Sequence, residues 1–146
     1  MFATAPGRLS QGEAVRFLQR ATFGGSPSEV AGLIDEGVDR WWQREVAETP
    51  NNTNYELFLR DGVRAPTIWN RYFTGNALLR KRMAYALSQI FVTSYSGIDG
   101  NAVFEYIDLL EENCFGTYRD LLDVISTSVA MGQYLTYAWN LSLIHI

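Results

Sequence analysis

The chain has 146 residues, of which 47% are hydrophobic and 19% charged, which is typical of one globular domain and excludes a disordered segment. A formal charge of −4 without a basic stripe argues against nucleic-acid binding, because phosphates attract clustered Lys and Arg. The single cysteine, Cys114, excludes an internal disulfide and a cysteine-based zinc site, and no stretch approaches the roughly 20 apolar residues that span a bilayer.

Capping boxes predict the first two helices. Ser10 with Glu13, and Ser26 with Glu29, have the spacing at which each side chain accepts a hydrogen bond from the other residue's backbone N–H. Gly24 and Gly37 are expected to end these helices. Asp39 is the expected N-cap of a third helix that ends before Pro50. The apolar positions that we expect to be buried are Ala14, Phe17, Leu18, Ala21, Val30, Leu33, Ile34, Trp41, Trp42 and Val46.

Helical periodicity continues after a polar loop at residues 51–54. A short helical turn is expected at 55–60, and Pro66 starts a helix that carries Ile68, Trp69, Tyr72 and Phe73. Asn76 is the expected cap of the strongest helix. The apolar side chains of that helix are Leu79, Met83, Ala86, Leu87 and Ile90.

The last third of the chain predicts three more helices. Asn101 is expected to cap a helix, Thr117 with Asp120 offers a third capping box, and a short helix is expected over 131–139. The helix that begins near Asn101 has an apolar stripe that consists of Val103, Tyr106, Ile107, Leu110 and Cys114. No segment alternates between apolar and polar residues, so we predict an all-α fold, a multi-helix bundle or an orthogonal helical array.

The last six residues, 141–146, differ from the sequence before them. They resemble a translated sequencing adapter, so we predict that residues 1–140 are the N-terminal part of one helical domain and that residues 141–146 are a non-native tail. An ordinary apolar helix end or strand is the alternative interpretation. The only histidine, His145, lies in this tail.

Four blocks resemble the bacterial family catalogued as domain of unknown function 1800 (DUF1800). They are residues 16–24, 79–92, 113–122 and 130–135, and Val129 stands where the family usually has proline. The resemblance implies a longer protein whose next conserved block would follow residue 140, so the chain is expected to be a fragment that is truncated at its C-terminal side. It also implies that many members are exported, although residues 1–7 are too short and uncharged for a signal peptide. The family implies no activity and no catalytic residues.

The residue types present exclude several reactions. Residues 1–140 contain no imidazole for a Ser-His or Cys-His pair or for a His-Glu-x-x-His zinc motif. No phosphate-binding or dinucleotide-binding glycine motif is present, so we assign no cofactor and no catalytic residue. Glu105, Asp108 and Glu112 have i, i+3, i+7 spacing, which suits an acid–base pair or a calcium or magnesium site. A solvated acidic helix face is the favoured alternative.

Two further groups attract attention. Arg82 borders the apolar stripe of its helix, so we predict that it is partly buried and paired with Glu111 or Glu112. Five aromatic residues form the second group. Their spacing favours a role in the core, and a sugar- or peptide-binding face is the alternative. The five are Trp41, Trp42, Trp69, Tyr72 and Phe73.

The sequence therefore leaves two classes of function open. The first is a helical binding or assembly module of an exported protein, with a protein or a saccharide as its partner. The second is the N-terminal part of an enzyme, such as a hydrolase, whose catalytic residues lie beyond residue 140.

Overall fold

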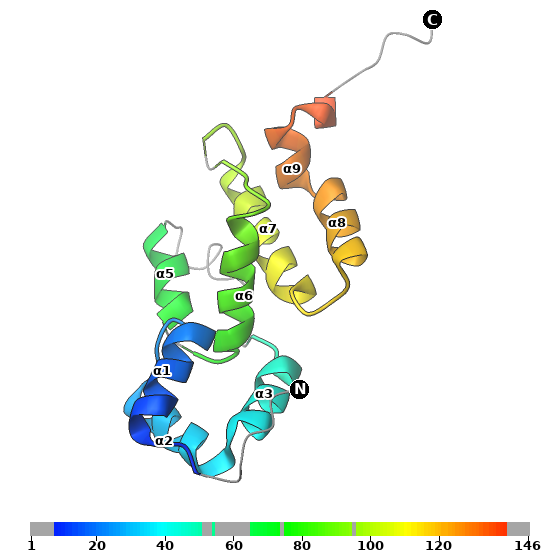
Figure 1. Cartoon of the computed structure of the whole chain (residues 1–146). Helices are drawn as coiled ribbons and strands as arrows, with labels where there is room; N and C mark the ends of the chain where they lie inside the picture. The colour runs from blue at the N-terminus through cyan, green and yellow to red at the C-terminus, as the bar shows by residue number, and fades with distance from the viewer. Residues whose placement is uncertain (1–7, 51–53, 55–64, 74, 95, 140–146) are drawn as a thin grey trace, which may run out of the picture. The chain divides into compact units, whose positions relative to one another are not determined.

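The computed structural model describes residues 8–50, 54, 65–73, 75–94 and 96–139, and within these ranges every regular element is helical (Figure 1). The all-α prediction is therefore confirmed. The elements are α1 (Gln11–Ala21), α2 (Pro27–Glu36), α3 (Val38–Ala47), α5 (Ala65–Phe73), α6 (Leu78–Ser88), α7 (Gly100–Asn113), α8 (Tyr118–Thr127), α9 (Val129–Tyr134) and the 3-10 helix η1 (Tyr137–Trp139). None of the described helices is long and apolar enough to cross a membrane.

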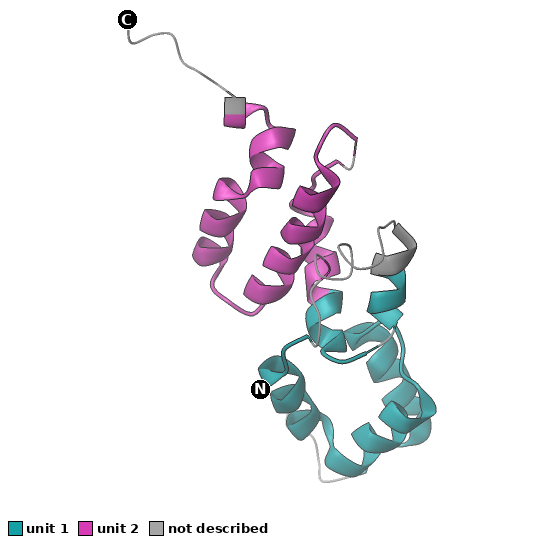
Figure 2. Cartoon of the chain, turned by 180° about the vertical axis from the view of Figure 1, so that it is seen from behind, with its two compact units in different colours: residues 1–51, 69–82 teal, residues 52–68, 83–146 magenta. Residues whose placement is uncertain are grey.

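The chain divides into two compact units (Figure 2). Unit 1 consists of residues 1–51 and 69–82, and unit 2 consists of residues 52–68 and 83–146. Two of the three boundaries along the chain fall within helices, one in α5 and one in α6, so both helices contribute residues to each unit. The expectation of one domain over residues 1–140 stays a prediction.

In unit 1, α2 packs against both α1 and α3. The buried side chains repeat at helical spacing on each element, and the Phe17 ring meets the Trp41 ring edge-on at 5.0 Å between centroids. The core of these three helices is formed by Ala14, Leu18, Val30, Leu33 and Trp41. Of the other positions expected there, Trp42 is exposed, whereas Phe17, Ala21, Ile34 and Val46 are half-buried.

In unit 2, α7 packs against α8 and α9, which also contact each other. The predicted stripe of α7 is confirmed at Val103, Tyr106, Leu110 and Cys114, all of which are buried, and Ile107 packs at the edge of the core. The core cluster is Ala84, Ile98, Ala102, Val103, Tyr106, Leu110, Leu121, Ile125, Ala130 and Met131.

Three predicted caps are wrong. Gly37, with a φ of 80°, precedes α3 without a side-chain cap, and Asp39 lies in the first turn. Asp99, not Asn101, caps α7, because its carboxylate accepts the Asn101 N–H at 3.1 Å. Asn76 is separated from α6 by Ala77 and donates its side-chain amide to the Thr49 carbonyl oxygen at 2.8 Å.

The predicted buried face of α6 is also partly wrong. Leu79 is buried, but Met83 and Ile90 are exposed, whereas Lys81 and Ala84 are buried. Ile90 lies beyond Ser88, where the helix ends. The expected helix over 131–139 is instead α9, which is followed by Thr136 at a φ of 62° and then η1. The turn at 55–60, the tail at 141–146 and loop residues 51–53 lie outside the described residues.

Candidate functional site

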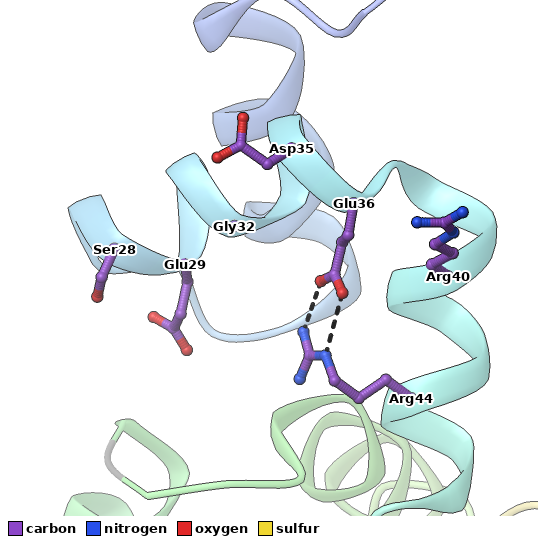
Figure 3. Close-up of a pocket in the computed structure, with 7 residues that line it drawn as sticks. All are labelled: Ser28, Glu29, Gly32, Asp35, Glu36, Arg40 and Arg44. Carbon is purple, nitrogen blue, oxygen red and sulfur yellow. Dashed lines mark hydrogen bonds and ion pairs between the residues drawn. The ribbon is translucent and has the colours of Figure 1, made fainter.

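A surface pocket of about 620 Å³ lies in unit 1 between α2 and α3 (Figure 3). Helix α2 contributes Ser28, Glu29, Gly32, Asp35 and Glu36, and α3 contributes Arg40 and Arg44. Gly32 is in the middle of α2, where an added Cβ would meet no atom within 4 Å. The pocket is therefore open above the helix backbone.

Most charges of this pocket already have partners. Arg44 donates to both oxygens of Glu36, at 2.9 and 3.4 Å, and to Glu45 at 2.9 Å. The hydrogen bond that Arg44 donates to Glu36 raises the pKa of Arg44. Asp35 pairs with Arg8. Because these carboxylates are held by arginines, the pocket suits electrostatic recognition better than acid–base chemistry.

A second feature of unit 1 is the aromatic face, which we define as Phe23, Trp69, Tyr72 and Phe73. Phe23 stacks on Tyr72 at 4.9 Å between ring centroids, and Phe73 and Trp69 each meet one of these rings edge-on at 5.7 Å. Tyr72 is buried, but Trp69 is 46% exposed and Phe73 is 60% exposed. The predicted aromatic set therefore splits, since Trp41 and Tyr72 belong to the interior and the other three rings reach the surface.

Arg82 lies against this face. Its guanidinium carbon is 4.8 Å from the centroid of the Phe23 ring, a cation–π geometry, and the side chain is half-buried as predicted. Its pairing with Glu111 or Glu112 stays a prediction. The aromatic contact was not foreseen from the sequence, because Phe23 and Arg82 are far apart along the chain.

The three carboxylates predicted as an acid–base or metal cluster lie in different surroundings on α7. Asp108 is buried, whereas Glu105 and Glu112 are exposed. Asp108 accepts hydrogen bonds from the Asn54 backbone N–H at 2.6 Å and from the Asn54 side-chain amide at 2.7 Å. No group of three or more Asp, Glu, His or Cys residues that could hold a metal ion occurs in the described part of the chain. The calcium or magnesium hypothesis stays a prediction.

Unit 2 instead brings Asp108 close to Glu111, one turn further along α7. The Asn54 amide also donates to Glu111 at 3.2 Å, and both carboxylates and Asn54 are buried. Sequence reasoning considered Glu111 only as a partner for Arg82. The i, i+3 spacing of Asp108 and Glu111 was a usable signal, but nothing local to α7 indicates that Asn54 joins them.

The predicted capping residues fulfil structural roles. Ser10 and Glu13 form a complete capping box, in which the hydrogen bond from the Ser10 side chain lowers the pKa of Glu13. Ser26 and Glu29 form the second box, with the Ser26 N–H 2.6 Å from the carboxylate. At α8, Thr117 accepts the Asp120 N–H at 3.2 Å and donates its hydroxyl to the Asp120 carboxylate at 2.6 Å.

Comparison with known proteins decides the family. A family model described as a protein of unknown function (DUF1800) matches residues 16–142, which is most of the chain. The chain belongs to the DUF1800 family. No curated protein and no solved structure matches it. The DUF1800 match contains all four blocks of the sequence resemblance, including Phe23 of the aromatic face and Arg82 beside it.

Proposed function

We propose that this DUF1800 chain is a helical binding module that holds a partner protein through its aromatic face. The observation that supports this function is the exposure of Trp69 and Phe73, which are linked by ring contacts to Tyr72 and Phe23. Exposed rings that are fixed by neighbouring rings lose little conformational entropy when they are covered. The family resemblance supports placing the module in an exported bacterial protein.

The composition of the face favours a protein over a saccharide. Tryptophan, tyrosine and arginine are the residues most enriched at the energetic centres of protein interfaces, and the face combines Trp69 and Tyr72 with the neighbouring Arg82. A saccharide needs a ring face bordered by hydrogen-bonding groups. The two exposed rings instead meet their neighbours edge-on, Trp69 against Tyr72 at 84° and Phe73 against Phe23 at 62°.

Selection from a display library of random peptides tests this function. We expect enriched peptides to contain apolar side chains and to lose about tenfold or more in affinity when Trp69 or Phe73 is replaced by Ala, because each ring is a central contact. Trp42→Ala is the matched control, since Trp42 is 51% exposed in the same unit but makes no ring contact within the described residues.

Two results would contradict the proposal. One is enrichment solely of peptides that bind Trp69→Ala and Phe73→Ala as tightly as the unmodified chain. The other is failure to enrich any peptide while the chain is retained on a polysaccharide column, which would instead indicate the saccharide-binding alternative.

A further inference from the structure

A separate groove of about 550 Å³ runs along α1 in unit 1. Its lining is mostly apolar, and three half-buried side chains, Leu9, Phe17 and Ala21, supply the apolar atoms. The Phe17 ring is held edge-on by the buried Trp41, at 84° between ring planes, so this part of the floor is fixed by the core. The remaining lining residues are Glu13, Arg16 and Arg20.

The two arginines at the border of the groove outnumber its single carboxylate, so the lining has a net positive formal charge. Arg16 and Arg20 are exposed and stand at i, i+4, so their side chains emerge on the same face of α1. Neither makes an ion pair within the ranges that the structure describes. Glu13, the one acidic residue of the lining, accepts hydrogen bonds from the Ser10 N–H at 2.9 Å and the Ser10 hydroxyl at 2.6 Å. Its carboxylate is therefore held at the start of the helix, where it also interacts electrostatically with Arg16.

The distribution of charge over the chain points in the same direction. Unit 1 contains nine Lys or Arg and seven Asp or Glu residues, a formal charge of +2, although the whole chain has a charge of −4. Unit 2 contains three Lys or Arg and nine Asp or Glu residues, a formal charge of −6. The α1 groove thus belongs to the positively charged part of an acidic protein.

We propose that the α1 groove binds an acidic amphipathic segment of a partner protein. An apolar side chain of that segment would cover Leu9, Phe17 and Ala21, and its carboxylates would pair with Arg16 and Arg20. Arginine suits this role because its planar guanidinium binds a carboxylate through two parallel hydrogen bonds. A phosphate chain would match the arginines but would leave the apolar floor exposed. This site is distinct from the aromatic face, and the inference does not depend on the function proposed for that face.

Two synthetic peptides of equal length test the proposal, one repeating Leu and Glu and the other repeating Leu and Lys, each with a fluorescent label for anisotropy. The acidic peptide should bind the unmodified chain, and rising salt should weaken the binding because exposed ion pairs are screened. Arg16→Glu combined with Arg20→Glu should weaken this binding by about tenfold or more and should produce binding of the basic peptide. Arg40→Glu is the matched control, since Arg40 is exposed in unit 1 but lies outside the groove.

The outcomes separate clearly. The proposal is overturned if the acidic peptide does not bind, if it binds the double Glu variant as tightly as the unmodified chain, or if Arg40→Glu weakens it equally. Circular dichroism of each variant checks that the helices are intact. If the Glu variant fails to fold, Arg16→Gln combined with Arg20→Gln tests the same prediction. This variant removes the charge without reversing it, so its affinity for the acidic peptide should also fall.

Discussion

Glu45 shows how one residue can organise elements that are distant in sequence. It is 5% exposed, and its carboxylate accepts the Leu79 N–H at 3.1 Å as well as a hydrogen bond from Arg44. Leu79 is in the first turn of α6, where backbone N–H groups have no partner within the helix. Glu45 of α3 therefore caps α6 from outside, and its negative charge suits the positive end of the helix dipole.

Replacing Glu45 with Ala should lower the free energy of unfolding by about 2 kcal/mol, because it leaves the Leu79 N–H without its acceptor. Urea denaturation followed by circular dichroism measures the change. Glu45→Gln, which keeps an acceptor oxygen, should restore part of the loss. Glu48→Ala is the control, since Glu48 lies 3.7 Å from Arg44 and is more exposed. An equal loss at both positions would show that the buried cap has no special importance.

Tyr106 predicts a change of stability at high pH. Burial raises its pKa from 10.0 to about 12, and its hydroxyl donates to the Phe91 carbonyl oxygen at 2.9 Å. Between these two pH values the unfolded chain loses the phenol proton while the folded chain keeps it, so the free energy of unfolding falls as pH rises. The stabilisation is complete below pH 10 and is lost by about pH 12.

Urea unfolding of the unmodified chain and of Tyr106→Phe is measured at a series of pH values from 9 upward. The difference between the two proteins separates the effect of Tyr106 from the effects of the other tyrosines. The variant should lose about 1 kcal/mol near neutral pH for the missing hydrogen bond. It should also show a smaller decrease above pH 10. Identical pH profiles for the two proteins would mean that the Tyr106 hydroxyl is not protected from water.

Single residues also mark the limit of what local sequence can predict. Lys81 is 2% exposed, although a lysine within an Arg-Lys-Arg run is typical of a solvated helix surface. Trp42 follows the buried Trp41 directly, and hydrophobicity alone does not distinguish the two rings. Trp41 contacts Phe17 of α1, and this contact between distant segments is not indicated by the local sequence.

At the scale of elements, the local sequence predicted helix caps best where the capping residue and the residue that it bonds lie within one helical turn. The capping boxes at Ser10 and Ser26 are complete because each involves residues three positions apart. The cap of α6 comes from α3, whereas Asn76, the neighbouring residue of a capping type, bonds the Thr49 carbonyl oxygen instead. The buried face of α6 was misjudged for the same reason, because the residues that cover Ala84 lie far along the chain.

Removal of a capping hydroxyl should have a local cost. Ser10→Ala should reduce the free energy of unfolding by about 1 kcal/mol, because the Glu13 N–H loses its acceptor and the carboxylate loses the Ser10 hydroxyl. Gln11→Ala, one position further along, should change it little, since Gln11 is exposed and Ala favours a helix. Thermal unfolding followed by circular dichroism compares the two. A larger loss for Gln11→Ala would be inconsistent with the capping role.

Two glycines associated with α2 should respond to alanine in opposite directions. Gly32 is inside the helix and has open space around its missing Cβ, so Gly32→Ala should stabilise the protein by roughly 0.5–1 kcal/mol. Gly37 has a φ of 80°, which alanine adopts only with strain, so Gly37→Ala should destabilise it by roughly 1–2 kcal/mol. Paired urea denaturation curves test both values. A destabilising Gly32→Ala would mean that the surface of the pocket in Figure 3 is more crowded than its geometry indicates.

For the whole molecule, helical periodicity predicted the class of fold, but composition did not predict how charge is divided between the two units. The chain has a net formal charge of −4, whereas the two units have formal charges of +2 and −6. The division depends on which segments fold together, because unit 1 combines residues 1–51 with residues 69–82. That combination adds Arg71, Arg80, Lys81 and Arg82 to the N-terminal helices. The linear sequence does not indicate that these segments belong to one unit.

Because negative charge is concentrated in unit 2, an added positive charge should stabilise unit 2, whereas an added positive charge should not stabilise unit 1. Glu105→Lys, on the exposed face of α7, should raise the free energy of unfolding by ~0.2–0.5 kcal/mol at low salt, because it relieves repulsion among carboxylates. Gln43→Lys adds a charge to an exposed site of α3 in the positive unit and should give no gain. Urea denaturation at low salt and in 1 M NaCl distinguishes the cases, since screening should remove most of the Glu105→Lys gain. Equal gains at both sites would indicate that only the total charge of the chain matters, and a gain that survives 1 M NaCl would assign the effect to helix propensity instead.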